Sequence, residues 1–142
     1  MADSQSVLTV SIVTPDGKVY DNEKATLIVV KTQLGELGIM PNHVPVIASL
    51  AVDEARVQSV DGKETDEIAV NGGFVEFSEN TATIVADTAE CQADIDVDRA
   101  KNAQKRAEAR IQEAQQAQDS DASARAEVAL RRAINRINVA GK

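Results

Sequence analysis

The sequence predicts a β-sandwich or barrel followed by two antiparallel helices, and the main support is a change in composition near Glu90. Residues 1–90 hold 5 Lys and Arg against 15 Asp and Glu, together with every proline and most of the glycines. Residues 91–142 hold 10 Lys and Arg against 8 Asp and Glu, many alanines and one glycine near the end. Glycine and proline separate short strands, whereas alanine favours helix. We therefore expect a β domain over residues 1–90 and a two-helix domain over residues 91–142.

Short apolar runs separated by turn residues predict the strands of the first domain. Leu8 to Val13 contains alternating apolar and polar side chains, which is typical of a half-buried strand. Leu27 to Val30 is a continuous, mostly β-branched run that fits a strand buried on both faces. Eight to ten such strands at close spacing favour a sandwich or barrel over a parallel sheet. The expected strands span 8–13, 18–21, 25–31, 46–52, 55–60, 64–70, 74–78 and 81–86.

Turn residues mark the connections between these strands. Asp61-Gly62 is the strongest hairpin signal, and Glu79-Asn80 marks a second hairpin. Asn71-Gly72-Gly73 is expected to be a turn between two strands. The segment Leu34–Pro45 contains two glycines and two prolines, so we expect it to be irregular. Within that segment, the simplest interpretation of His43 is a side chain that hydrogen-bonds to the backbone of a tight loop.

Helical periodicity begins after Glu90. Asp94, Asp96 and Asp98 offer N-caps for a first helix. The polar segment Gln115–Asp121 is expected to end it, and Ser123 is expected to cap a second helix. Apolar residues recur at spacings of three and four, as Ala100, Ala103, Ala107, Ile111 and Ala114 in the first helix and as Ala126, Leu130, Ala133, Ile137 and Ala140 in the second.

Most side chains in these apolar stripes are alanines, and their small size has an energetic consequence. Burial of apolar area contributes roughly 25 cal/mol per Å², so an alanine side chain contributes far less than a leucine. We therefore expect the hairpin to be held only weakly, against itself and against the β domain. A ligand or partner needs only a few kcal/mol of differential binding to shift such a balance. The sequence thus favours a movable arm on a fixed module, with a helical cap of fixed position as the alternative.

Composition excludes several classes of function. The net charge of −8 and the presence of only three aromatic residues argue against nucleic-acid binding. Cys91 is the only cysteine and His43 the only histidine, so neither a disulfide framework nor a Cys- or His-based metal site is expected. No nucleophile–base set is apparent, which argues against an enzyme. No apolar run approaches the roughly 20 residues of a membrane helix, and Met1–Ser6 is polar. A cytoplasmic protein that meets a membrane only through a partner is expected.

The arginines offer the most specific chemistry. Arg99 and Arg106 lie two turns apart on the first expected helix, and Arg132 and Arg136 lie one turn apart on the second. In an antiparallel hairpin the two pairs approach and form a cluster of four guanidinium groups. Such a cluster favours a polyanion, because guanidinium groups bind phosphates through paired hydrogen bonds. A solvated face with local Asp and Glu partners is the alternative interpretation.

Several motifs, taken in order, resemble the epsilon-subunit family of bacterial F-type ATP synthases. The resemblance covers essentially the whole chain and is specific, because separate motifs appear in the family's order. They are GELGIMPNHVP at 35–45, AVNGGFVE at 69–76, TIVADTAE at 83–90, IDVDRA at 95–100 and the arginine-containing segment 125–136.

The resemblance implies a fold and a role. It implies an N-terminal ten-stranded β-sandwich followed by a C-terminal antiparallel two-helix hairpin. It implies a non-catalytic subunit of the central rotor stalk, without a required cofactor, whose sandwich binds the gamma subunit and the c ring. The helices of the family either fold as a hairpin or extend toward the catalytic alpha and beta subunits, where they inhibit ATP hydrolysis. The implied location is peripheral, on the cytoplasmic face of the bacterial cell membrane.

The resemblance also implies site residues. In some bacterial members ATP binds the folded hairpin as a regulatory ligand, through Ile or Leu, Asp, two variable residues, Arg and Ala, plus later arginines. The matching residues here are Ile95, Asp96, Arg99 and Ala100, with Arg106, Arg132 and Arg136 in the later positions. The implied contact with the c ring is Glu36. Further expected partner contacts are His43 in the same segment and Arg131 of the second helix, whose charge suits docking on an acidic catalytic surface.

One departure from the family and one alternative function follow from the sequence. The link Gln115–Ser123 looks longer and more polar than in many relatives, which would change how the hairpin closes. The alternative function is a stand-alone nucleotide-binding sensor. Such a sensor would bind ATP as a monomer and would capture no gamma partner.

Overall fold

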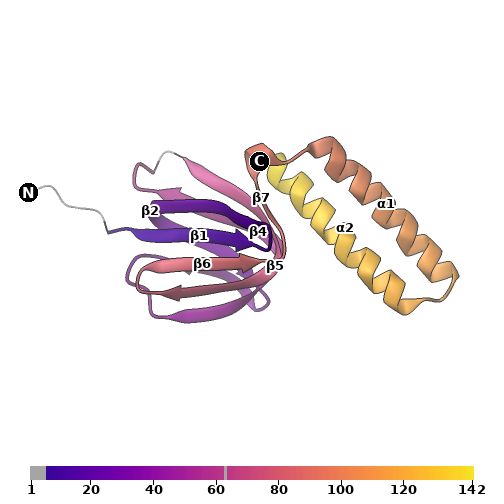
Figure 1. Cartoon of the computed structure of the whole chain (residues 1–142), viewed down its shortest axis with the longest axis horizontal. Helices are drawn as coiled ribbons and strands as arrows, with labels where there is room; N and C mark the ends of the chain where they lie inside the picture. Colours follow the sequence, from indigo (N-terminus) through magenta and orange to yellow (C-terminus); the bar gives the residue numbers. More distant parts are fainter. Residues whose placement is uncertain (1–5, 63) are drawn as a thin grey trace, which may run out of the picture.

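A computed structural model describes residues 6–62 and 64–142, which form a strand domain and a helical hairpin side by side (Figure 1). Helix α2 lies between the strands and α1, and α1 is on the outside (Figure 1). The elements are β1 Leu8–Thr14, β2 Gly17–Thr32, β3 Gly35–Ile39, β4 Val46–Ser59, β5 Thr65–Ser78, β6 Thr81–Ala86, β7 Ala89–Cys91, the 3₁₀ turn η1 Gln92–Asp94, α1 Val97–Gln116 and α2 Ser120–Ala140.

The strands form one sheet that closes on itself. Their order is β1-β6-β5-β4-β2-β3, β7 pairs with β5, and β1 also pairs with β2. Strand β1 is parallel to β6 and antiparallel to β2. These pairings confirm the predicted class, a β domain followed by a two-helix hairpin. Side chains at alternate positions fill the space inside with an apolar core that includes Leu8, Ile12, Ile28, Phe77 and Ile84.

The described residues contain seven strands where ten were expected, because three strands are long and serve both layers. Strands β2 and β4 each merge two of the short strands that the sequence predicted. Strand β5 does the same through Asn71-Gly72-Gly73, so the predicted turn at these residues was wrong. Residues 65–71 pair with 52–58 of β4, whereas residues 73–77 pair with both β4 and β6. The long strands pass from one layer of the sandwich to the other.

The bend in β5 depends on glycine. Gly72 and Gly73 have φ angles of 88° and 120°, in the region that L side chains rarely adopt. A Cβ on Gly73 would lie 2.0 Å from the main-chain oxygen of Val85 on β6. Only glycine fits here, and the same feature that suggested a turn in the sequence instead lets the strand continue across the layers.

The segment Leu34–Pro45 is only partly irregular, which corrects a second expectation. Its first part is β3, an edge strand paired with β2 from Thr32–Gly35 to Ile28–Ile39. Gly35 and Gly38 are compatible with this strand because the hydrogen bonds between β3 and β2 are made by main-chain atoms. The remainder is a loop, in which the Nδ1 of His43 donates to the main-chain oxygen of Val44 at 2.7 Å, as the backbone-bonding interpretation predicted.

The helices begin at aspartates. Asp96 caps α1 through a hydrogen bond from the amide of Arg99 at 3.0 Å. Asp119, and not the expected Ser123, caps α2 by accepting from the amide of Ala122 at 3.1 Å. The glutamines after Glu113 continue α1, so the link consists of residues 117–119 only. The expectation of a long polar link was therefore wrong.

Alanines of the predicted stripes lie between the helices. Ala100, Ala107 and Ala114 of α1 and Ala126 and Ala133 of α2 are buried. None of the helices in the described ranges is both long enough and apolar enough to cross a membrane.

Removing the helical hairpin is expected to leave a folded β domain. The main core contains only residues from the strands, so a chain that ends after Gln92 keeps it intact. The truncation removes contacts of the hairpin with the surface of the β domain, such as that of Val139 with Ala69, and burial of one aliphatic side chain of this kind contributes up to about 3 kcal/mol. Circular dichroism should show a β spectrum and a cooperative melt. A coil spectrum would contradict this expectation.

Candidate functional site

The C-terminal half of α2 attaches the hairpin to the β domain. Val139 is fully buried and packs with Ile95 and Ala69 in a small apolar cluster separate from the main core. The Nε2 of Gln92 donates to the main-chain oxygens of Val139 and Lys142, at 3.0 and 2.7 Å. Apolar contact is therefore limited here, and polar contacts supply much of the attachment.

Asn135 is the most buried polar anchor of α2, with 6% of its surface exposed. Its Nδ2 lies 3.1 Å from the main-chain oxygen of Asp53, 3.3 Å from that of Val70 and 3.1 Å from the Oδ1 of Asn71. Two hydrogens serve three acceptors, so one hydrogen bond is shared. Asn71 is itself fixed by a bond from its Nδ2 to the Oγ1 of Thr88 at 3.0 Å. The sequence analysis missed Asn135, although a short amide next to the apolar stripe was a signal.

Three ion pairs surround this anchor. The Nε of Arg136 lies 2.8 Å from the Oε1 of Glu90, and the Arg132 guanidinium lies 3.8 Å from the Asp87 carboxylate. Beyond the last turn of α2, the Nζ of Lys142 lies 2.6 Å from the Oε1 of Glu54, whose side chain is only 11% exposed. Each pair joins the hairpin to the strand domain, so charge holds the arm in place along with Asn135.

The four predicted arginines lie along one side of the hairpin and line two neighbouring cavities. Arg99, Arg106 and Arg136 line a cavity of about 280 Å³ together with three carboxylates. Arg106, Arg132 and Arg136 line a second cavity of about 240 Å³. Ala103 belongs to both linings, so the cavities adjoin. The carboxylates of the first cavity are Glu90, Asp94 and Asp96.

The other residues of the predicted nucleotide motif also lie at this place. Asp96 and the buried Ala100 line the first cavity, and the Oδ1 of Asp96 is engaged as the cap of α1. Ile95 does not line the cavity. It packs beneath the hairpin against Ala69 and Val139. Within the motif, Ile95 therefore anchors the start of α1 to the β domain, and Asp96 and Ala100 form part of the cavity wall. Glu90, which the sequence did not point to, accepts a hydrogen bond from the guanidinium group of Arg136.

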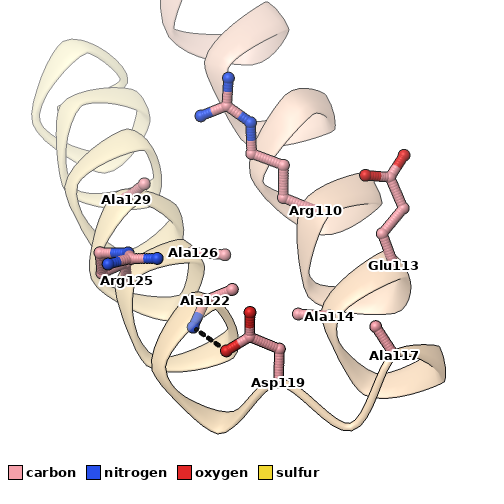
Figure 2. Close-up of a pocket in the computed structure, with 9 residues that line it drawn as sticks. All are labelled: Arg110, Glu113, Ala114, Ala117, Asp119, Ala122, Arg125, Ala126 and Ala129. Carbon is pink, nitrogen blue, oxygen red and sulfur yellow. Dashed lines mark hydrogen bonds between the residues drawn. The ribbon is translucent and has the colours of Figure 1, made fainter.

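A larger cavity of about 460 Å³ lies between the helices near the hairpin tip (Figure 2). Its floor is formed by alanines from both helices, with Arg110 and Arg125 at the sides and the helix cap Asp119 at the end (Figure 2). It arises because small side chains leave space between the helices. None of the predicted nucleotide-binding residues lines it, so its size alone does not make it the candidate site.

The predicted partner contacts fall in two regions. Glu36 is exposed on the edge strand β3, where its carboxylate accepts from the Arg56 guanidinium at 2.9 Å. His43 follows β3, and its ring stands edge-on to Phe77 with ring centres 5.9 Å apart. Arg131 is exposed on α2 and lines a cavity of about 300 Å³ against the β domain. The first two therefore belong to the strand domain and the third to the arm.

Exposed apolar side chains accompany Glu36. The exposed fractions are 101% for Leu34, 61% for Met40, 70% for Val44 and 73% for Ile47. These four exposed apolar side chains lie within residues 34–47, in the turn before β3, the loop after it and the start of β4, and are available for contact with another protein. Cys91, by contrast, is half-buried, and burial raises the pKa of its thiol, which makes it a poor nucleophile.

Comparison with known proteins gives consistent results over the whole chain. Residues 7–92 match the model of the ATP synthase delta/epsilon chain β-sandwich domain, and residues 93–141 match that of the long α-helix domain of the same chain. The chain is 70% identical over 140 residues to the ATP synthase epsilon chain of Levilactobacillus brevis, covering 99% of both chains. It is 70% identical over 134 residues to that of Pediococcus pentosaceus, covering 94% of this chain and 95% of the other.

Solved structures share the fold. A chain in the Euglena gracilis mitochondrial ATP synthase, in a structure of OSCP, F1 and c-ring, aligns with a TM-score of 0.77 and 21% identity, over 98% of this chain and 83% of that one. A chain in the central stalk and c-ring of the Tetrahymena thermophila enzyme aligns with a TM-score of 0.51 and 17% identity, over 65% of this chain and 72% of that one.

Proposed function

This chain belongs to the ATP synthase delta/epsilon family, and on that premise we propose that residues 1–90 join the rotor while residues 91–142 form a regulatory arm. The chain is a non-catalytic subunit of the ATP synthase. Its role is to couple the central stalk to the catalytic head during proton-driven synthesis. It meets the membrane only through the complex, on the cytoplasmic face of the bacterial cell membrane.

The strand domain is proposed to bind the gamma subunit and the c ring. The exposed residues Leu34, Met40, Val44 and Ile47 supply apolar area for such a contact. Glu36 adds an exposed carboxylate beside them, and His43 orders the loop through its bond to the backbone. This combination of apolar and charged side chains is suited to a stable protein partner.

The arm is proposed to leave the β domain, extend toward the alpha and beta subunits and inhibit ATP hydrolysis. The observation that carries this proposal is the nature of the docking surface. It joins α2 to the strands through one small apolar cluster, the Asn135 amide and three ion pairs. The cations of these pairs, Arg132, Arg136 and Lys142, are all partly exposed, so a competing surface with acidic side chains can offer them equivalent partners at small net cost. Arg131 is suited to docking on an acidic catalytic surface.

ATP is proposed as the regulatory ligand of the docked arm. Arg99, Arg106 and Arg136 converge on one cavity, and Arg132 lines the adjoining one. A phosphate group of ATP would take the place of the Glu90 carboxylate beside Arg136. The ion pair between Arg136 and Glu90 would thus be replaced by one between Arg136 and the ligand. Asp96 would lie away from the phosphates, because a carboxylate next to them repels them. By linkage, a ligand that binds only the docked arm stabilises that state as its concentration exceeds the dissociation constant.

Removal of residues 93–142 is expected to raise ATP hydrolysis by the assembled complex several-fold. The extended arm is the obstructing element, while the strand domain that joins the rotor remains intact. The measurement is the hydrolysis rate of complexes purified with full-length or truncated chain, normalised to the amount of chain retained. Proton-driven synthesis by the same complexes is the control for assembly. An unchanged rate with the truncated chain fully incorporated would show that the arm is not inhibitory.

A further inference from the structure

Two glutamates lie together beneath the end of α2. In the pairing of β4 with β5, Glu67 is opposite Arg56 and Glu54 is opposite Ala69, so the two glutamates are diagonal neighbours on one face. Each has one carboxyl oxygen, Oε2, that is buried without a hydrogen-bond donor. Val139 packs on Ala69, next to this pair. The pair therefore lies at the surface where the arm docks.

Cations face the pair from two elements. Arg56 of β4 lies 3.9 Å from Glu54 through its Nε and also contacts Glu36 of β3. Lys142, which follows α2, lies 2.6 Å from the Oε1 of Glu54. Gln92 holds the main-chain oxygen of Lys142 in place. Lys142 thus connects the end of the arm directly to the carboxyl pair.

Two adjacent carboxyl groups with buried oxygens are satisfied only when they share a proton, because a carboxylate has no donor. Burial, followed by the hydrogen bond and the charge of Glu54, raises the pKa of Glu67 from 4.5 to about 7, although Lys142 and Arg56 act to lower it. Burial alone would raise the pKa of Glu54, but hydrogen bonds with Lys142 and Glu67 hold that pKa below its ordinary value. The proton therefore resides on Glu67, which donates to the ionised Glu54.

We propose that the Glu54–Glu67 pair is a proton-operated latch, in which the shared proton favours docking of α2 and its loss weakens the docked state. Loss of the proton places two carboxylates side by side beneath the helix end. Undocking opens the pair to water, where the two charges are hydrated and separate. This inference rests on the proposed function only in that the arm is able to leave the β domain.

The direction of the pH effect follows from linkage. The docked pKa of Glu67, about 7, is higher than its ordinary value of 4.5, and hydration of the released pair lowers it toward that value. Its contribution to docking is therefore complete below about pH 4.5 and is lost as the pH rises toward 7. The docked pKa of Glu54 is lowered, so protonation of Glu54 weakens docking. This opposite effect falls at more acidic pH than the titration of Glu67. One linked proton changes the docking equilibrium by at most about tenfold per pH unit.

The latch can be tested on the isolated full-length chain. Spin labels at Asp16→Cys and Gln118→Cys in a Cys91→Ala background report the distance between the strand domain and the hairpin tip, both exposed positions. We expect the released population to grow between pH 5 and 7, by up to tenfold per unit. Glu67→Gln, which keeps a donor and cannot ionise, should remain docked across this range. Glu76→Gln, an exposed glutamate of the same strand, should behave as the unsubstituted chain.

A second measurement keeps the test independent of the labels. Carboxyl carbon chemical shifts should show Glu67 titrating near pH 7 in the unsubstituted chain. Titration near 4.5, or the same pH profile in Glu67→Gln as in the unsubstituted chain, would overturn the latch. Neither outcome depends on the ATP synthase complex, so the latch and the proposed inhibition can fail separately.

Discussion

Replacing Asn135 with leucine is expected to release the arm while the strand domain stays folded. Leucine branches at Cγ as asparagine does but donates no hydrogen bond, so the oxygens of Asp53, Val70 and Asn71 lose their donor beneath the helix. An unsatisfied buried polar group costs about 1–3 kcal/mol. The ratio of docked to released molecules should therefore fall by about 5- to 150-fold. Undocking returns these oxygens to water, which is why the loss appears as release and not as unfolding.

The measurement for this substitution is the distance between spin labels on the strand domain and on the hairpin tip, with the melting temperature of the strand domain recorded in parallel. Asn138→Leu is the matched control, because Asn138 lies one turn further on α2 and is exposed. An arm that remains docked in Asn135→Leu would show that the amide bonds contribute little to the attachment.

Substituting Arg106 with alanine is expected to weaken ATP binding by about 10- to 150-fold. Arg106 lines both cavities of the candidate site. A hydrogen bond to a charged group is worth about 1.5–3 kcal/mol, and each 1.4 kcal/mol corresponds to a factor of ten in affinity. Glu90→Gln should have the opposite effect, since it frees Arg136 from its carboxylate partner. Calorimetric titration of the isolated chain measures both changes.

Arg125→Ala is the control for the ATP measurement. Arg125 lies on the same hairpin but lines only the tip cavity, so removal of its charge tests whether net charge alone alters affinity (Figure 2). Absence of heat at millimolar ATP with the unsubstituted chain would argue that the arginines serve partner docking only. Equal losses in Arg106→Ala and Arg125→Ala would point to non-specific attraction of the anion.

The sequence predicted what local chemistry determines. Hydrophobic alternation located most strands, and the stripe that includes Ala107 and Ala133 located the helix contact. It could not predict that Gly72 and Gly73 bend one strand across two layers, because a turn and a bend require the same backbone freedom. It also placed the start of α2 too late, since both Asp119 and Ser123 are good caps and only the packing of the hairpin selects between them.

The candidate site also combines features that local sequence predicts with features that only the tertiary structure determines. The spacing of the arginines was sufficient to place them on one side of the hairpin. The partners that occupy them, Glu90 and Asp87, come from the strand domain, and no periodicity connects residues so distant in sequence. The pairing of Glu54 with Glu67 likewise depends on strand register, and Asn135 gains its importance only from the main-chain oxygens that face it.

The parallel pairing of β1 with β6 also determines when this chain completes its folding. Residues 9–13 lie beside residues 81–85, so β1 gains its last neighbour only after most of the strand domain has been synthesised. Contacts this distant in sequence slow folding, whereas the helical hairpin closes through local contacts. Until β6 arrives, one side of β1 remains open to pairing with other chains, so the protein is sensitive to aggregation during this interval.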